Sequence, residues 1–257
     1  MRSEQAFVAF KTILAKEIIR FLRIWVQTIL PPVITTALYF IIFGSLIGSQ
    51  VGPMEGIRYM DFIVPGLIMM AVITNSYSNV VASFYSAKFQ RSVEELLVSP
   101  TPNWIILAGF ISGGVVRGLV VGLVVTLVSL FFSHLHVYNL WVTMSVVLLT
   151  AILFSLGGFI NSVFAHSFDD ITIVPTFVLT PLTYLGGVFY SIHLLPAFWR
   201  KVSLANPILY MIDAFRYGIL GVTDINLFAS YGIIIAFIVA LTALSLRLLH
   251  TGYGMRT

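Results

Sequence analysis

Six long apolar runs restrict what this chain of 257 residues can fold into more than any other feature. A helix needs about 20 apolar residues to cross the hydrocarbon core of a bilayer, and only helices and closed barrels satisfy their backbone groups there. Charged residues make up 9% of the chain, against about 25% in soluble domains. We therefore predict an all-α membrane protein with a single domain over residues 1–257. The six predicted transmembrane helices are 25–47, 62–84, 104–132, 141–164, 171–190 and 228–249.

Basic residues are unevenly distributed between the two sides of these runs, and this predicts the orientation of the chain. Loops on the cytoplasmic side of a membrane protein carry the excess of Lys and Arg. One side holds Arg2, Lys11, Lys16, Arg20, Arg23, Lys88, Arg91, Arg247 and Arg256. The other side holds Arg58, Arg200, Lys201 and Arg216. We expect both termini and the 85–103 loop in the cytoplasm. Because the net charge of +4 arises at membrane edges, we predict no nucleic-acid partner.

Residues 4–24 have the pattern of an amphipathic helix and not of a signal peptide, because charges interrupt the apolar residues and no small-residue cleavage site follows. One helical face carries Phe7, Phe10, Leu14, Ile18, Phe21 and Trp25. The opposite face carries Lys16, Arg20 and Arg23. This predicts an interfacial helix with its apolar face in membrane lipid and its basic face toward anionic headgroups. A cytoplasmic helix packed on a partner protein is the alternative.

The segment at 84–103 is the polar part of the apolar first half of the chain. Its apolar residues recur at helical spacing and are Phe89, Val93, Leu96 and Leu97. Its charged residues are Lys88, Arg91, Glu94 and Glu95. The pattern predicts a short amphipathic helix over 87–98, which Pro100 and Pro102 end. Such a helix offers a surface to a soluble partner, or it is a solvated turn that merely joins two spans.

The second and third runs carry polar and small residues at membrane depth. One face of the second run holds Asn75, Asn79, Ser83 and Ser86, which we expect to face other helices or a water-filled path. The third run spaces glycines by four, at Gly109 and Gly113 and at Gly114, Gly118 and Gly122, so that helices can approach closely. Arg117 lies among these glycines and is a candidate functional charge. A structural pair or a snorkelling anchor is the alternative role, because no acid lies within any predicted span.

The fifth run and its sequel are irregular. Pro175 and Pro181 remove backbone hydrogen bonds and predict a kink. The same run places Thr176, Thr180 and Thr183 on one face, where they either line a path or bond to carbonyls freed by the prolines. Residues 191–227 are too polar to cross the membrane. We predict that they form short re-entrant helices between spans five and six, with a break at Asn206-Pro207. Within this segment Asp213 and Arg216 are spaced to pair across one helical turn.

The sequence lacks the residue patterns of several kinds of catalytic and binding site. No glycine is followed by lysine, so a phosphate-binding loop of the Walker type is missing. His134 and His136 have no third ligand near them in sequence, and no nucleophile–base or paired-carboxylate pattern stands out. We therefore expect no catalytic residues, no metal site and no cofactor in this chain. A permease driven by a separate motor fits best; a motor-independent carrier or channel, a membrane enzyme acting on lipids and a regulatory scaffold are the alternatives.

Three stretches carry a resemblance to a known family. They are RSVEELLVSP at 91–100, PLTYLGGVFYSIHLLP at 181–196 and NPILYMIDAFRYGILG at 206–221. Together with the N-terminal helix, they resemble the permease subunit of ABC-2 type transporters over the full length of the chain. The resemblance implies a homodimer in a bacterial inner membrane, joined to two cytoplasmic ATPase subunits that hold the ATP and Mg. It also implies export of an amphipathic small molecule, a lipid or a glycan.

The resemblance also implies roles for particular residues. The loop after the second span would be the coupling helix that docks on the ATPase, with contacts from Phe89, Arg91, Glu94, Glu95 and Leu97 and a minor second contact at 166–170. The second and fifth spans would line the path, with contributions from Asn75, Asn79, Thr176, Thr180 and Thr183. The segment after the fifth span would form the outer re-entrant helices that close the exit.

Overall fold

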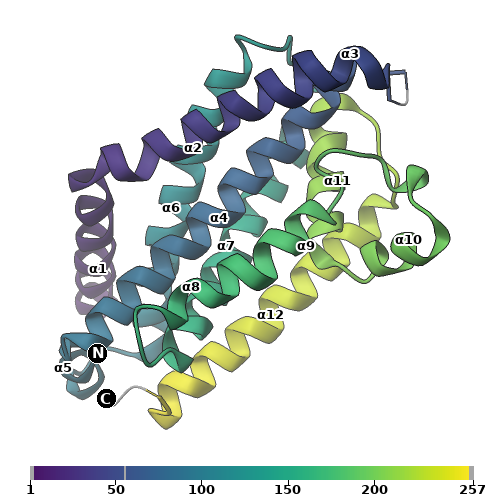
Figure 1. Cartoon of the computed structure of the whole chain (residues 1–257). Coiled ribbons are helices and arrows are strands. Elements are labelled where there is room, and N and C mark those ends of the chain that lie inside the picture. The colour runs from purple at the N-terminus through teal and green to yellow at the C-terminus, as the bar shows by residue number, and fades with distance from the viewer. Residues whose placement is uncertain (1–2, 55, 255–257) are drawn as a thin grey trace.

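The computed structural model describes residues 3–54 and 56–254, and these residues form helices joined by short loops, with no β-strand (Figure 1). The all-α prediction is confirmed. The elements are α1 (Ser3–Arg23), α2 (Trp25–Tyr39), the π-helix η1 (Phe40–Ile47), α3 (Gly48–Val51), α4 (Tyr59–Phe89), α5 (Ser92–Val98), α6 (Asn103–Ser129), α7 (Leu140–Phe164), α8 (Asp170–Val174), the π-helix η2 (Pro175–Leu179), α9 (Thr180–Tyr184), the 3-10 helix η3 (Ile192–Leu194), α10 (Ala197–Leu204), α11 (Pro207–Leu220) and α12 (Leu227–Thr251).

Within the described residues, five helices are long and apolar enough to cross a membrane. They are Trp25–Gly44, Tyr59–Phe89, Asn103–Ser129, Leu140–Phe164 and Leu227–Thr251. The run at 171–190 forms a shorter helical segment, made of α8, η2 and α9 in succession, and the chain leaves the helix after Tyr184. The π-helical turn begins at Pro175, which has no N–H for a regular helical bond. Five of the six predicted transmembrane helices are therefore present as helices of sufficient length and apolar composition, and the one at 171–190 stays a prediction.

Helix α4 is the centre of the bundle (Figure 1). It packs against α6, α7 and α11, and 78% of its most apolar segment is buried. By contrast, 17% of the corresponding segment of α2 and 11% of that of α12 are buried. Helices α2 and α12 therefore present apolar faces to lipid or to another protein chain.

Glycines of α6 let this helix approach two neighbours closely, as the spacing predicts. A Cβ atom on Gly113 would lie 2.5 Å from the Cβ of Glu17 in α1. A Cβ atom on Gly118 would lie 1.9 Å from the hydroxyl oxygen of Ser76 in α4. Because no real Cβ tolerates such distances, the two glycine positions fix how closely α1 and α4 pack on α6.

Helix α1 turns part of its polar face into the bundle, which corrects the face predicted for 4–24. Ile24 leaves the helical conformation, with φ −111° and ψ 34°, and Figure 1 shows α1 meeting α2 at an angle there. Ile13 and Glu17 are buried against α6, while Phe7 remains 65% exposed. Arg20, predicted to face lipid headgroups, points inward. The reason is that the narrow glycine surface of α6 accepts this face of α1.

The segment at 191–227 forms two helices on either side of Asn206-Pro207, as predicted. The Asn206 side chain accepts a hydrogen bond from the backbone N–H of Ile208, and Pro207 occupies the first turn of α11. Helix α11 then packs on α4, α7 and α12, so it belongs to the bundle and is not a surface loop. That α10 and α11 dip into the membrane as re-entrant helices stays a prediction.

Asp213 and Arg216 of α11 are both buried and each contacts groups outside α11, and their pairing stays a prediction. The Asp213 carboxylate accepts hydrogen bonds from the Thr223 hydroxyl and from the backbone N–H of Asp224. The guanidinium of Arg216 lies 4.0 Å from the centre of the Phe62 ring and donates to a backbone carbonyl. These contacts fasten α11 to the loop that follows it and to the start of α4.

The elements separate into two ends along the bundle (Figure 1). The start of α1, all of α5 and the end of α12 lie at one end, whereas α3 and α10 lie at the other. A partner that binds α5 therefore meets the ends of α1 and α12 on the same side of the molecule.

Candidate functional site

The helix predicted at 87–98 begins later in the structure, at Ser92. Helix α4 continues to Phe89, and Arg91 then adopts a left-handed backbone conformation with φ 60°. Since a residue in this conformation cannot continue a right-handed helix, α5 starts after it. Of the predicted coupling residues, α4 carries Phe89, the turn carries Arg91, and α5 carries Glu94, Glu95 and Leu97.

Helix α5 is attached to the bundle on one face and open to solvent on the other. Val93 is fully buried in an apolar cluster that also contains Phe84 and Phe110. Glu94 and Glu95 are exposed on the opposite side. The buried face therefore ties α5 to the apolar cluster to which α4 and α6 contribute.

The turn at 166–170 joins the surface formed by α5 and the end of α4. The ring of Phe168 packs edge-on against Tyr85 and Phe89, with centroid distances of 4.9 and 5.3 Å. The carboxylate of Asp170 accepts hydrogen bonds from the backbone N–H groups of His166 and Ser167, at 2.9 and 3.0 Å. These bonds lower the pKa of Asp170 and keep it ionised. The two loops predicted to contact an ATPase therefore form one continuous surface.

Lys88 fastens this surface to α7. Its side chain is 3% exposed, and its Nζ donates to the carbonyl oxygens of Val163 and Ala165, at 2.9 and 2.8 Å. The last carbonyls of a helix have no partners within the helix and carry the negative end of its dipole. Lys88, expected only as one of the cytoplasmic charges, thus caps α7.

A groove of about 640 Å³ runs between α5 and the end of α12. It is lined by Glu94, Leu97, Val98, Asn103, Leu249, His250, Thr251 and Gly252. Val98 is 86% exposed at its edge. The groove places an exposed apolar side chain beside the acidic face of α5, which suits a protein partner.

A buried polar network links α1 to the inner half of α4. Glu17 is fully buried and accepts hydrogen bonds from the Ser83 hydroxyl at 2.5 Å and from the Arg20 guanidinium at 3.1 Å. Arg20 also donates to the side-chain oxygen of Asn79, at 2.8 Å. At Asn79 and Ser83 the polar stripe of α4 therefore contacts α1. That the stripe also lines a path stays a prediction. Sequence reasoning missed Glu17, although its spacing of four from Ile13 was a signal.

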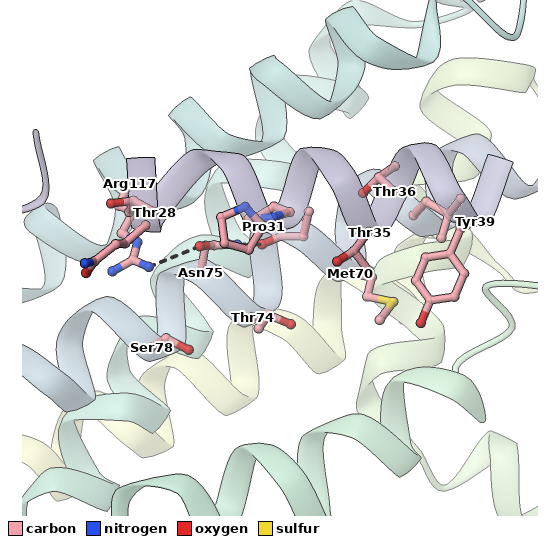
Figure 2. A pocket seen from close by; sticks show the side chains of 14 residues that line it. Thr28, Pro31, Thr35, Thr36, Tyr39, Met70, Thr74, Asn75, Ser78 and Arg117 are labelled. Carbon is pink, nitrogen blue, oxygen red and sulfur yellow. Dashed lines mark hydrogen bonds between the residues drawn. The ribbon is translucent and has the colours of Figure 1, made fainter. Parts of the chain in front are cut away.

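A second polar site lies in a cavity of about 330 Å³ between α2, α4 and α6 (Figure 2). Its lining residues are Gln27, Thr28, Pro31, Pro32, Thr35, Thr36, Tyr39, Leu67, Met70, Ala71, Thr74, Asn75, Ser78 and Arg117. Figure 2 shows Arg117 toward one end and Tyr39 toward the other. Arg117 donates to the side-chain oxygen of Asn75, at 3.3 Å. The structure thus brings two predicted site residues together, and adds hydroxyl groups of α2 that the sequence reasoning did not single out.

The threonines of the fifth run have different surroundings. Thr176 and Thr180 are exposed, whereas Thr183 is buried. Thr180 donates to the carbonyl of Pro175 at 2.9 Å, and Thr183 to that of Leu179 at 2.7 Å. These carbonyls are not the ones that Pro175 and Pro181 leave without a donor, which belong to residues four positions before each proline, so both alternatives for the stripe stay predictions.

Comparisons with known proteins agree with this arrangement. The sequence profile of the family described as ABC-2 type transporter matches residues 8–220. The inner membrane transport permease YadH of Escherichia coli K12 is 60% identical over 252 residues, which cover 98% of each chain. Nodulation protein J of Rhizobium leguminosarum bv. viciae is 24% identical over 214 residues, 83% of each chain. The chain therefore belongs to the ABC-2 type transporter family, as a multi-pass transport permease of the inner membrane.

Proposed function

We propose that this chain is the membrane subunit of an ATP-driven exporter and that a separate cytoplasmic ATPase drives it through α5. The observation that carries the proposal is the amphipathic arrangement of α5. Glu94 and Glu95 form an exposed acidic face, and buried Val93 attaches the helix to the apolar cluster of the bundle. A floppy loop would dissipate the motion of a motor, whereas an anchored helix transmits it. The substrate is an amphipathic small molecule, a lipid or a glycan.

The proposed docking surface combines α5 with the 166–170 turn. The contact of Phe168 with Phe89 makes the two loops one surface, and Lys88 connects that surface to α7. The Glu17 network connects the inner half of α4 to α1. Closure of the ATPase would therefore move α1, α4 and α7 together and change the access to the path.

The proposed assembly is a homodimer with two ATPase subunits. Each subunit has six spans, with α8, η2 and α9 as the fifth, and α10 and α11 close the outer side. Both termini lie in the cytoplasm with α5, a proposal supported by the common end of the bundle at which the start of α1 and the end of α12 lie and by the positive charges of the sequence there (Figure 1). Asn75, Asn79, Thr176, Thr180 and Thr183 are the proposed path residues.

Charge reversal on α5 tests the proposal. Glu94→Lys combined with Glu95→Lys should abolish co-purification of the partner ATPase subunit and stop transport in membrane vesicles. Lys201→Glu on α10, an exposed charge reversal at the opposite end, is the control for docking and should leave co-purification unchanged. Wild-type co-purification and transport in the double variant would contradict the proposed docking. Transport by the chain alone in liposomes under an ion gradient would favour a motor-independent carrier or channel instead.

A further inference from the structure

Arg117 is a cation that faces a cavity without a carboxylate partner. Its guanidinium makes one hydrogen bond, to the Asn75 side-chain oxygen at 3.3 Å, and its Nε has no hydrogen-bond partner among residues 3–54 and 56–254. A second guanidinium, that of Arg20, binds Asn79, one helical turn along α4 from Asn75. Arg20 is itself paired with Glu17, so the charge at the cavity remains positive.

A second copy of the chain cannot supply the missing negative charge from a spanning segment. The acidic residues are Glu4, Glu17, Glu55, Asp61, Glu94, Glu95, Asp169, Asp170, Asp213 and Asp224. None of them lies in the six apolar runs. An ionised side chain at membrane depth is costly unless a counter-charge or a strong set of hydrogen-bond acceptors compensates it. No apolar run of a second copy therefore offers Arg117 a carboxylate, which leaves this cation open to an anionic ligand in the cavity.

The local geometry holds the guanidinium toward the cavity. The amide nitrogen of Asn75 donates to the backbone carbonyl of Ala71 at 3.0 Å, so its oxygen is directed at Arg117. Asn75 lies near the middle of α4, and this contact keeps Arg117 from extending to the membrane edge as a snorkelling anchor would. Hydroxyls of Thr28 and Ser78 line the cavity near this end (Figure 2).

The rest of the cavity wall suits an apolar chain. Away from Arg117, Figure 2 shows Pro31, Met70 and Tyr39 together with the threonines of α2 and α4. Pro32, Leu67 and Ala71 also line the cavity. A volume of about 330 Å³ lies at the small end of the range for ligand sites, roughly 300–1,000 Å³. The cavity has room for the head group of an amphipathic ligand and the first part of its apolar chain. The rest of that apolar chain would lie along the exposed face of α2.

We propose that the cavity between α2, α4 and α6 binds the phosphate-class oxyanion head of an amphipathic molecule through Arg117 and Asn75. This inference rests on the proposed function and deepens it by naming the charge of the transported or regulating molecule. The planar guanidinium forms parallel hydrogen bonds to an oxyanion, a geometry that a neutral head group cannot use. Asn75 orients the guanidinium, and the apolar wall selects an amphipathic ligand over a free ion.

Binding to the purified full-length chain in detergent, without the ATPase, tests this inference separately from docking. The probes are dihexanoyl phosphatidic acid, the matching uncharged dihexanoylglycerol and inorganic phosphate, each titrated calorimetrically. We expect wild type to bind the phosphatidic acid at one site per chain and the diacylglycerol much more weakly. Arg117→Gln should lower the affinity for the phosphatidic acid at least about tenfold, the size expected for losing a charge-assisted hydrogen bond. Arg58 is an exposed arginine outside the cavity, so Arg58→Gln should leave the affinity for the phosphatidic acid unchanged.

A second variant keeps the test valid if Arg117→Gln does not fold. Thr35 is an exposed cavity residue of α2, so Thr35→Trp fills the space without touching the guanidinium, and it should also abolish binding of the phosphatidic acid. Inorganic phosphate binding as tightly as the phosphatidic acid, with the same loss in Arg117→Gln, would overturn the inference that the cavity selects an amphipathic ligand and would identify a free anion as the ligand. Equal binding of the charged and uncharged lipids, or no effect of either cavity variant, would overturn the inference even if the ATPase docks normally.

Discussion

At the scale of single residues, three cations connect neighbouring helices of this protein. Each donates to an acceptor on another element: Arg20 and Arg117 to side-chain amide oxygens of α4, and Lys88 to carbonyls at the end of α7. The sequence marked Arg117 as a candidate because of its position inside an apolar run. It did not mark Lys88, since a lysine at a cytoplasmic edge is ordinary until the end of α7 is found beside it.

Lys88→Met should destabilise the fold, because it leaves the Val163 and Ala165 carbonyls without their donor. The expected loss in the free energy of unfolding is about 1.5–3 kcal/mol, the usual worth of a hydrogen bond to a charged group. Denaturant unfolding of the detergent-solubilised chain measures it. Lys201→Met, at an exposed lysine of α10, should stay within about 0.5 kcal/mol of wild type. Equal losses in the two variants would show that Lys88 contributes nothing by capping α7.

At the scale of elements, close helix contacts depend on glycine. The periodic glycines of α6 were predicted to serve helix packing, and the structure confirms this with α1 on one side and α4 on another. The start of α5 was predicted wrongly because helical periodicity runs through Arg91 without interruption, whereas the backbone turns there. Periodicity reports which residues share a face, but not where the backbone leaves the helix.

Gly158→Ala in α7 tests one such contact. A Cβ at this position would lie 2.5 Å from the backbone carbonyl oxygen of Tyr77 in α4, and a backbone atom cannot move aside as a side chain can. We expect a loss of about 1–3 kcal/mol in the free energy of unfolding, typical of overpacking. Gly232→Ala in α12 is the matched control, with nothing within 4 Å of its Cβ, and should be neutral or slightly stabilising. A neutral Gly158→Ala would mean that α4 and α7 can separate at little cost.

At the scale of the whole molecule, the least buried spans indicate where other molecules touch the chain. Helices α2 and α12 leave most of their apolar surface open, and the segment from α8 to α9 exposes Thr176. In the proposed homodimer, the face with α8, η2 and α9 lies near the dimer axis, and α12 faces lipid. The chain contains no cysteine, so single introduced cysteines report distances between copies without background.

Thr176→Cys should form a cross-linked dimer in native membranes when treated with a mild oxidant or a short bis-maleimide. Val239→Cys, 63% exposed on α12, should remain monomeric under the same conditions. The readout is the mobility of the chain on a non-reducing gel. Cross-linking at Val239 but not at Thr176 would place the dimer axis on the opposite face and contradict the proposed path.

The sequence by itself determined the all-α membrane class, the apolar runs, the amphipathic pattern of α1 and α5, and the close packing along α6. These are local properties, because side-chain periodicity and residue size act over a few turns of helix. Only the tertiary structure decided which polar groups meet. Arg20 reaches Asn79 across 59 residues, Ser83 reaches Glu17 across 66, and Arg117 reaches Asn75 across 42. Such contacts depend on how each helix is rotated and placed in the bundle, which no single segment of sequence specifies.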